Sequence, residues 1–96
     1  MDNGREPSGW LPATVQEVAN LAFRVAGLVP LVELNHEGSV SLRRPEDDHE
    51  LAVAAEVCGQ LCLFVDGGDG DCVEIHGEDA VHAAVRRYSI SGRLLP

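Results

Sequence analysis

Residues 61–76, LCLFVDGGDGDCVEIH, constrain the fold more than any other part of the chain. Two short apolar runs flank a loop of glycine and aspartate, which is the pattern of a β-hairpin. Because side chains alternate across a strand, one face of this hairpin carries the larger aliphatic residues Leu61, Leu63, Val65, Val73 and Ile75. The opposite face then carries Cys62, Phe64, Cys72, Glu74 and His76.

A helix and a further hairpin are predicted before this segment, and a closing helix is predicted after it. A first helix begins at Thr14, because Thr14 and Glu17 have the spacing of a capping box, and it ends at Gly27. Residues 31–34 and 39–42 form a first hairpin, and Gly38 in its turn can take a positive φ. Residues 78–88 form a closing helix with His82 on its polar side, and residues 89–96 pair weakly or stay loose.

The segment 46–58 fits two structures. Acids at its beginning, alanines within it and Gly59 after it favour a helix. Its apolar residues also alternate with the period of a strand, at Leu51, Val53, Ala55 and Val57. The helix is preferred. The predicted fold is therefore α+β, of order α-ββ-α-ββ-α, with a four-stranded, mainly antiparallel sheet covered on one face by helices.

The length of 96 residues indicates one domain, with residues 1–9 as a flexible lead-in and residues 10–96 as the folded part. The polar beginning of the chain shows no secretory signal, and the longest uncharged apolar run, 57–65, is too short to cross a membrane. The expectation is a cytoplasmic protein that is a monomer or a homodimer.

The formal net charge is −9, and the chain contains no lysine. Such a charge repels nucleic acid and anionic membranes and favours a protein partner with a basic surface. Only four aromatic residues are present, which leaves few platforms for stacking on bases. No motif of a phosphate loop, a dinucleotide fold or a nucleophilic serine occurs, so the chain is expected to be non-catalytic and to carry no cofactor.

The predicted order of elements places most of the candidate binding residues at one end of the domain. Each element reverses the direction of the chain, so two acidic connections meet there, with Glu46, Asp47, Asp48, Asp66, Asp69 and Asp71. Such a cluster presents an acidic face to a basic partner, or supplies hard oxygen ligands to Ca²⁺ or Mg²⁺. The competing interpretation is a self-neutralising network, because the same end receives Arg43, Arg44, Arg86 and Arg87.

The cysteines offer a second candidate site. Cys58, Cys62, Cys72 and His76 have the residue types of a zinc site. Cys72 and His76, however, lie about 13 Å apart on an extended strand, so both cannot bind one ion. Cys62 can approach His76, with Cys58 near the same end. This leaves a three-ligand metal site or a thiol with a histidine base as alternatives to ordinary packed cysteines.

From residue 18 to residue 57 the chain resembles the first part of a class I type III secretion chaperone. A helix leads through Gly27-Leu28-Val29-Pro30-Leu31 into a strand pair, with the acids Glu46–Asp48 following. The resemblance implies a small, acidic, dimeric protein that binds an extended client segment. The preferred function is a stoichiometric inhibitor or adaptor that docks an acidic face on a basic protein, for example a phage-encoded blocker of nucleic-acid machinery.

Overall fold

The computed structural model describes residues 11–33, 38–67 and 70–96. The chain begins with helix α1 (Ala13–Ala26) and ends with helix α2 (Glu78–Ser91). Between them lie five strands, β1 (Val29–Glu33), β2 (Ser39–Arg43), β3 (Glu50–Val57), β4 (Gln60–Asp66) and β5 (Cys72–His76). The fold is α+β, as predicted, but it has five strands and two helices where four strands and three helices were expected.

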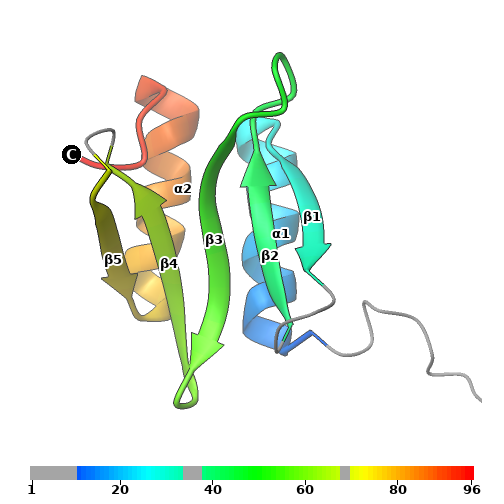
Figure 1. The fold of residues 1–96 in the computed structure, drawn as a ribbon, viewed down its shortest axis with the longest axis vertical. Helices are drawn as coiled ribbons and strands as arrows, with labels where there is room; N and C mark the ends of the chain where they lie inside the picture. Colours follow the sequence, from blue (N-terminus) through cyan, green and yellow to red (C-terminus); the bar gives the residue numbers. More distant parts are fainter. Residues whose placement is uncertain (1–10, 34–37, 68–69) are drawn as a thin grey trace, which may run out of the picture.

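The strands form one antiparallel sheet in chain order, β1-β2-β3-β4-β5. The helices pack on one face of this sheet, side by side and running in the same direction (Figure 1). No described element covers the other face, which we call the open face. The predicted second hairpin and its register are confirmed, because Cys62 pairs with His76 and Leu63 pairs with Ile75.

The core lies between the helices and the sheet. The helix α1 contributes Val15, Val18, Leu21 and Ala22, and α2 contributes Val81, Ala84 and Val85. The sheet contributes Val40, Leu42, Ala52, Ala54, Leu61, Leu63 and Val65. These strand residues recur at every second position, so burying them on one side leaves the intervening side chains on the open face.

The prediction of a helix over 46–58 is wrong, because residues 50–57 form the central strand β3. Ala52 and Ala54 face the helices and are almost fully buried, so small side chains are needed where α1 and the sheet pack together. Val53 lies on the open face and pairs with Phe64 of β4. The burial of Ala52 and Ala54 under the helices and the pairing of Val53 with Phe64 together override the helix propensity of alanine.

A two-residue turn explains why Gly59 does not end a helix. Cys58 and Gly59 both have positive φ, 52° and 79°, and they connect the paired residues Val57 and Gln60. Two successive residues with positive φ are typical of a type I′ hairpin turn. Cysteine is an uncommon residue in such a turn, so the sequence carries a weak signal for it.

The predicted capping box at the start of α1 is also wrong. The helix begins at Ala13 with Pro12 before it, and no side chain caps its first turn. Thr14 instead donates a hydrogen bond of 2.8 Å from its hydroxyl to Glu56 Oε2 on β3. This bond ties the beginning of α1 to the sheet, a long-range contact that residue spacing within the helix cannot reveal.

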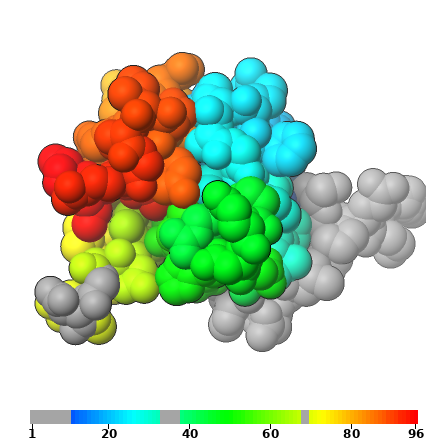
Figure 2. Space-filling view, turned by 90° about the horizontal axis from the view of Figure 1, so that it is seen from above, coloured from blue at the N-terminus to red at the C-terminus, as the bar shows by residue number. Residues whose placement is uncertain are grey.

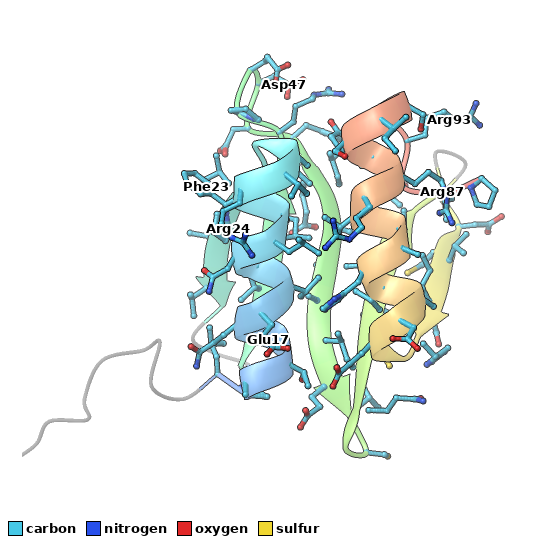
Figure 3. The ribbon with its side chains drawn as sticks, turned by 180° about the vertical axis from the view of Figure 1, so that it is seen from behind. Glu17, Phe23, Arg24, Asp47, Arg87 and Arg93 are labelled. Atoms are coloured by element: carbon cyan, nitrogen blue, oxygen red, sulfur yellow. The ribbon has the colours of Figure 1, made fainter. Side chains whose placement is uncertain are left out.

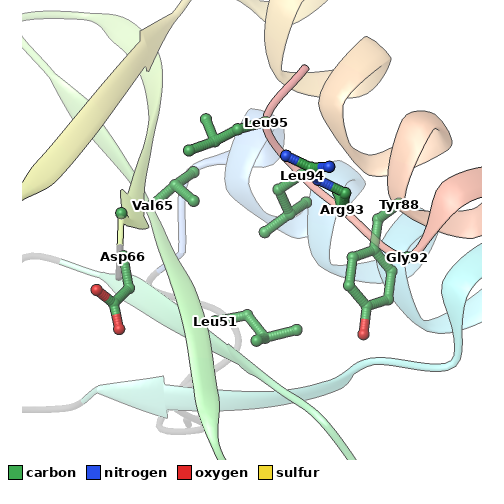
Figure 4. Close-up of a pocket in the computed structure, with 9 residues that line it drawn as sticks. Leu51, Val65, Asp66, Tyr88, Gly92, Arg93, Leu94 and Leu95 are labelled. Carbon is green, nitrogen blue, oxygen red and sulfur yellow. The ribbon is translucent and has the colours of Figure 1, made fainter. Parts of the chain in front are cut away.

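The C-terminal residues 92–96 pack against the fold, contrary to the expectation of a loose tail. Helix α2 continues to Ser91, and Leu94 beyond it is buried in the core. Arg87 Nη1 donates a hydrogen bond of 2.5 Å to the carbonyl oxygen of Leu94, which holds the chain in place. Leu94 and Leu95 line a pocket of about 250 Å³ together with Val65 and Tyr88 (Figure 4).

The division between buried and open faces predicts how two leucine substitutions differ. Leu63 is fully buried, so Leu63→Ala should lower the free energy of unfolding by about 2–5 kcal/mol. Leu31 on the open face is 48% exposed, so Leu31→Ala should cost about 1 kcal/mol or less. Urea unfolding followed by circular dichroism measures both values. Equal losses would contradict the assignment of the two faces.

Candidate functional site

The open face carries both apolar and polar side chains. Val29 and Leu31 of the edge strand β1 are exposed, and Val53, Ala55 and Phe64 in the middle of the sheet are half-buried. Polar side chains on the same face come from β2, β3 and β5, namely Ser41, Arg43, Glu50, Glu74 and His76. A sheet face with exposed apolar side chains and a charged margin is a common form of protein interaction surface.

A pocket of about 280 Å³ lies at one end of this face, and we call it the open-face pocket. Its apolar side chains include the directly paired Val53 and Phe64 of β3 and β4. The described residues that line it also include three carboxylates and a thiol, Glu50, Asp66, Asp71 and Cys72. No arginine lies among these described lining residues. The pocket therefore combines an apolar surface with a concentration of negative charge.

Glu50 is held in place at the margin of the open-face pocket by its neighbours on β2. The buried Ser41 hydroxyl donates a hydrogen bond of 2.6 Å to Glu50 Oε2. Arg43 Nη1 lies 3.9 Å from the same oxygen, while Arg43 Nε donates to Asp48 Oδ1 at 3.0 Å. One guanidinium is thus shared by two carboxylates, which leaves an excess of negative charge beside the pocket.

The acidic residues selected from the sequence lie in two connections at the same end of the sheet. Glu46, Asp47 and Asp48 belong to the β2–β3 turn. Asp66 and Asp71 lie on either side of the β4–β5 connection, and Asp69 lies outside the described residues. Figure 2, seen from that end, places the turn near residues 45–50, in green, beside the ends of β4 and β5. Of these residues, only Asp66 and Asp71 line the open-face pocket.

The β2–β3 turn is largely neutralised by its own arginines. Arg44 donates two hydrogen bonds to Asp47, of 3.0 and 2.6 Å, and this lowers the pKa of Asp47 from 3.8 to about 2. Arg43 pairs with Asp48 in the same turn. The predicted self-neutralising network is therefore present for these two acids. It does not include Arg87, which bonds to a backbone carbonyl, or Arg86, which lies between the helices.

Cys62, His76 and Glu74 form a chain of contacts at the opposite end of the open face. Cys62 Sγ lies 3.1 Å from His76 Nδ1, and His76 Nε2 lies 3.1 Å from Glu74 Oε1. An ionised carboxylate only accepts hydrogen bonds, so a neutral imidazole carries its hydrogen on Nε2 and accepts the thiol hydrogen at Nδ1. Burial raises the pKa of Cys62, with Glu74 adding to the effect. A raised pKa is the opposite of what activates a thiol nucleophile.

The three cysteines do not assemble into a metal site. Cys58 is exposed in the β3–β4 turn, and Cys72 is exposed at the far end of β5 from His76. The described residues contain no group of three or more cysteine, histidine or acidic side chains placed to hold a metal ion. Of the proposed set Cys58, Cys62 and His76, only the contact between Cys62 and His76 is formed.

Two residues of the open-face pocket were not selected from the sequence. Phe64 was assigned to the correct face of its strand, but its pairing with Val53 was hidden because residues 46–58 were assigned to a helix. Glu50 was missed for the same reason, since it lies at the first position of β3. The alternation of Leu51, Val53, Ala55 and Val57 is the signal that would have placed both beside Asp66 and Asp71.

The ion pair between Arg44 and Asp47 in the β2–β3 turn predicts that the stability of the fold depends on pH in the acid range. Because the pKa of Asp47 is lower in the folded chain, the pair stabilises the fold above pH 3.8 and its contribution is lost as the pH falls toward about 2. Carboxyl carbon NMR should show Asp47 titrating near pH 2, and Arg44→Gln should move the midpoint toward 3.8. Arg43→Gln is the matched control and should leave it unchanged. An unshifted Asp47 in the unsubstituted protein would contradict the pairing.

Exposure of the thiols predicts two classes of reactivity. Cys58 and Cys72 are exposed and should react rapidly with a thiol-specific disulfide reagent at neutral pH. Cys62 is fully buried and should react only at the rate of unfolding. Time-resolved absorbance of the released thiolate measures both phases, and Cys62→Ser should remove the slow phase alone. Three rapid thiols would contradict the burial of Cys62.

No family model, no curated protein and no solved structure was found to match this chain. Within the described part of the chain, no helix is both long and apolar enough to cross a membrane. The functional argument therefore depends on what the folded surface itself can bind. The candidate binding site is the open-face pocket, because it combines an apolar surface with charged side chains. Its described lining includes Glu50, Phe64, Asp66 and Asp71.

Proposed function

We propose that this protein is a non-catalytic binding protein that docks its open face on a protein partner with a basic surface. The open-face pocket accepts an arginine or lysine side chain of that partner. The observation that carries the proposal is the convergence of paired apolar residues, Val53 and Phe64, with carboxylates from two different strands and a loop. Such a pocket matches both parts of a long basic side chain, its aliphatic stem and its charged head.

The charge of the pocket supports a cationic occupant. Its described lining includes Glu50, Asp66 and Asp71. Arg43, which lies beside Glu50, also pairs with Asp48. The net charge of −9 adds a long-range attraction for basic partners, which speeds association at low ionic strength. Binding should therefore weaken as salt is added, since exposed charges are screened over about 10 Å at 0.1 M salt.

The apolar part of the pocket supports a side chain over a free metal ion. Phe64 is half-buried, so part of its aromatic surface remains available to a ligand. A cation over an aromatic face gains about 0.5–1 kcal/mol at an exposed site. Beyond the pocket, Val29 and Leu31 of β1 add further exposed apolar side chains, on the far side of Ser41 and Arg43 of β2. This larger area suits a protein surface that carries the basic side chain.

A pair of small probes of equal shape tests the proposal. N-acetylarginine amide carries the charge, and N-acetylcitrulline amide replaces the guanidinium with a neutral urea group. In amide NMR spectra of the ¹⁵N-labelled protein, the arginine probe should shift resonances of Glu50, Phe64, Asp71 and Cys72 in a saturable way. The citrulline probe should shift them much less. Equal effects of both probes would contradict a charge-selective pocket.

Substitutions assign the binding to the open-face pocket. Phe64→Ala and Asp71→Asn should each weaken binding of the arginine probe by about three- to tenfold, because each removes one of the two kinds of contact. Asp79→Asn removes the same charge from an exposed position in the first turn of α2 and is the matched control. If Asp79→Asn weakens binding as much as Asp71→Asn, the attraction depends on net charge alone and the pocket assignment is wrong.

A further inference from the structure

A groove of about 310 Å³ lies between α1 and α2, in the helix layer, and we call it the helix groove. The residues that line it are Glu17, Asn20, Leu21, Arg24, His82 and Arg86. Arg24 and Arg86 both lie in the C-terminal halves of their helices. Because the two helices run in the same direction (Figure 3), these halves lie at the same end of the helix layer. Glu17 lies nearer the beginning of α1, about 10 Å along the helix from Arg24. His82 likewise lies near the beginning of α2, one turn before Arg86.

The two arginines of the helix groove are exposed, and neither has a counter-ion among the described residues. Neither Arg24 nor Arg86 forms an ion pair within the described part of the chain, although Arg43 and Arg44 both do. Among the described residues that line the groove, Glu17 is the only acidic one, beside the two arginines. Arg24 is in the last turn of α1, where the helix dipole favours a cation. The dipole of α2 gives no comparable reason for Arg86, which precedes the last turn.

His82 provides a second and independent indication. The sequence placed it on the polar, solvated side of its helix, but its Nε2 atom is buried and has no hydrogen-bond partner in the described structure. Buried polar atoms in folded proteins are almost always paired with protein, water or a ligand. This unpaired ring nitrogen lies in the same groove as the exposed guanidinium groups of Arg24 and Arg86, so three polar side chains there are available to a ligand.

We propose that the helix groove is a binding site for a small oxyanion, a phosphate or a carboxylate group. Arg24 and Arg86 supply planar sets of N–H donors from two helices, and such donors match the oxygens of either group. The Asn20 amide and the His82 ring add donors in the same groove. The site lies on the layer opposite the open face, so it does not depend on the open-face pocket, and either assignment can fail alone.

Binding is tested on the full-length protein with sodium phosphate, sodium acetate and sodium chloride at matched ionic strength. The Nε–H resonances of Arg24 and Arg86 should shift in a saturable way with phosphate or acetate and stay unchanged with chloride. Saturation by phosphate alone assigns a phosphate-class ligand, and saturation by both assigns a general oxyanion site. Absence of saturation at tens of millimolar of either anion would overturn the proposal.

Arg86→Gln and Arg24→Gln should each weaken the binding of the responding anion by about tenfold, because each removes a charge-assisted contact. Arg93→Gln, an exposed arginine outside the helix groove, is the matched control for net charge and should leave the affinity unchanged. Amide spectra of all three variants verify that the fold is retained. Equal weakening by Arg93→Gln would overturn the assignment to this groove.

Discussion

Two parallel helices pack on one face of the sheet, α1 against β1, β2 and β3 and α2 against β4 and β5, and this contact decides which strand side chains are buried. Ala52 and Ala54 are small enough to let the helices approach the sheet, and Leu61, Leu63 and Val65 of β4 fill the space beside them. Because strand side chains alternate, burying this set also determines the opposite set. Val53 and Phe64 are on the open face because their neighbours are in the core.

The distribution of charge follows from the same topology. Antiparallel strands in chain order bring the β2–β3 and β4–β5 connections to one end of the sheet, so acids that are distant in sequence lie at a common margin. Arg43 and Arg44 neutralise much of the first connection. The open-face pocket, by contrast, has three carboxylates and no arginine among its described lining residues. The arginines of α1 and α2 lie in the other layer, so the two faces of the fold differ in charge.

The clustering of the acidic connections was predictable although one element was assigned incorrectly. A helix and a strand each carry the chain once across the domain, so replacing one by the other over residues 50–57 leaves the connections at the same ends. Strand identity does matter for the site, because only a strand places Val53 beside Phe64 and Glu50 beside the pocket. Local propensity was a poor guide here, since alanine at positions 52 and 54 serves interlayer packing.

The second hairpin, its register and the closing helix could be predicted from the sequence, because alternating and helical periodicities are local properties of these segments. The end at which the acids gather could also be predicted, because chain reversal depends only on the order of elements. Three features became visible in the fold alone: residues 50–57 form a strand, Thr14 bonds to Glu56, and His82 lies in a groove between helices. Each of these depends on contacts between distant segments, whose energies no local pattern contains.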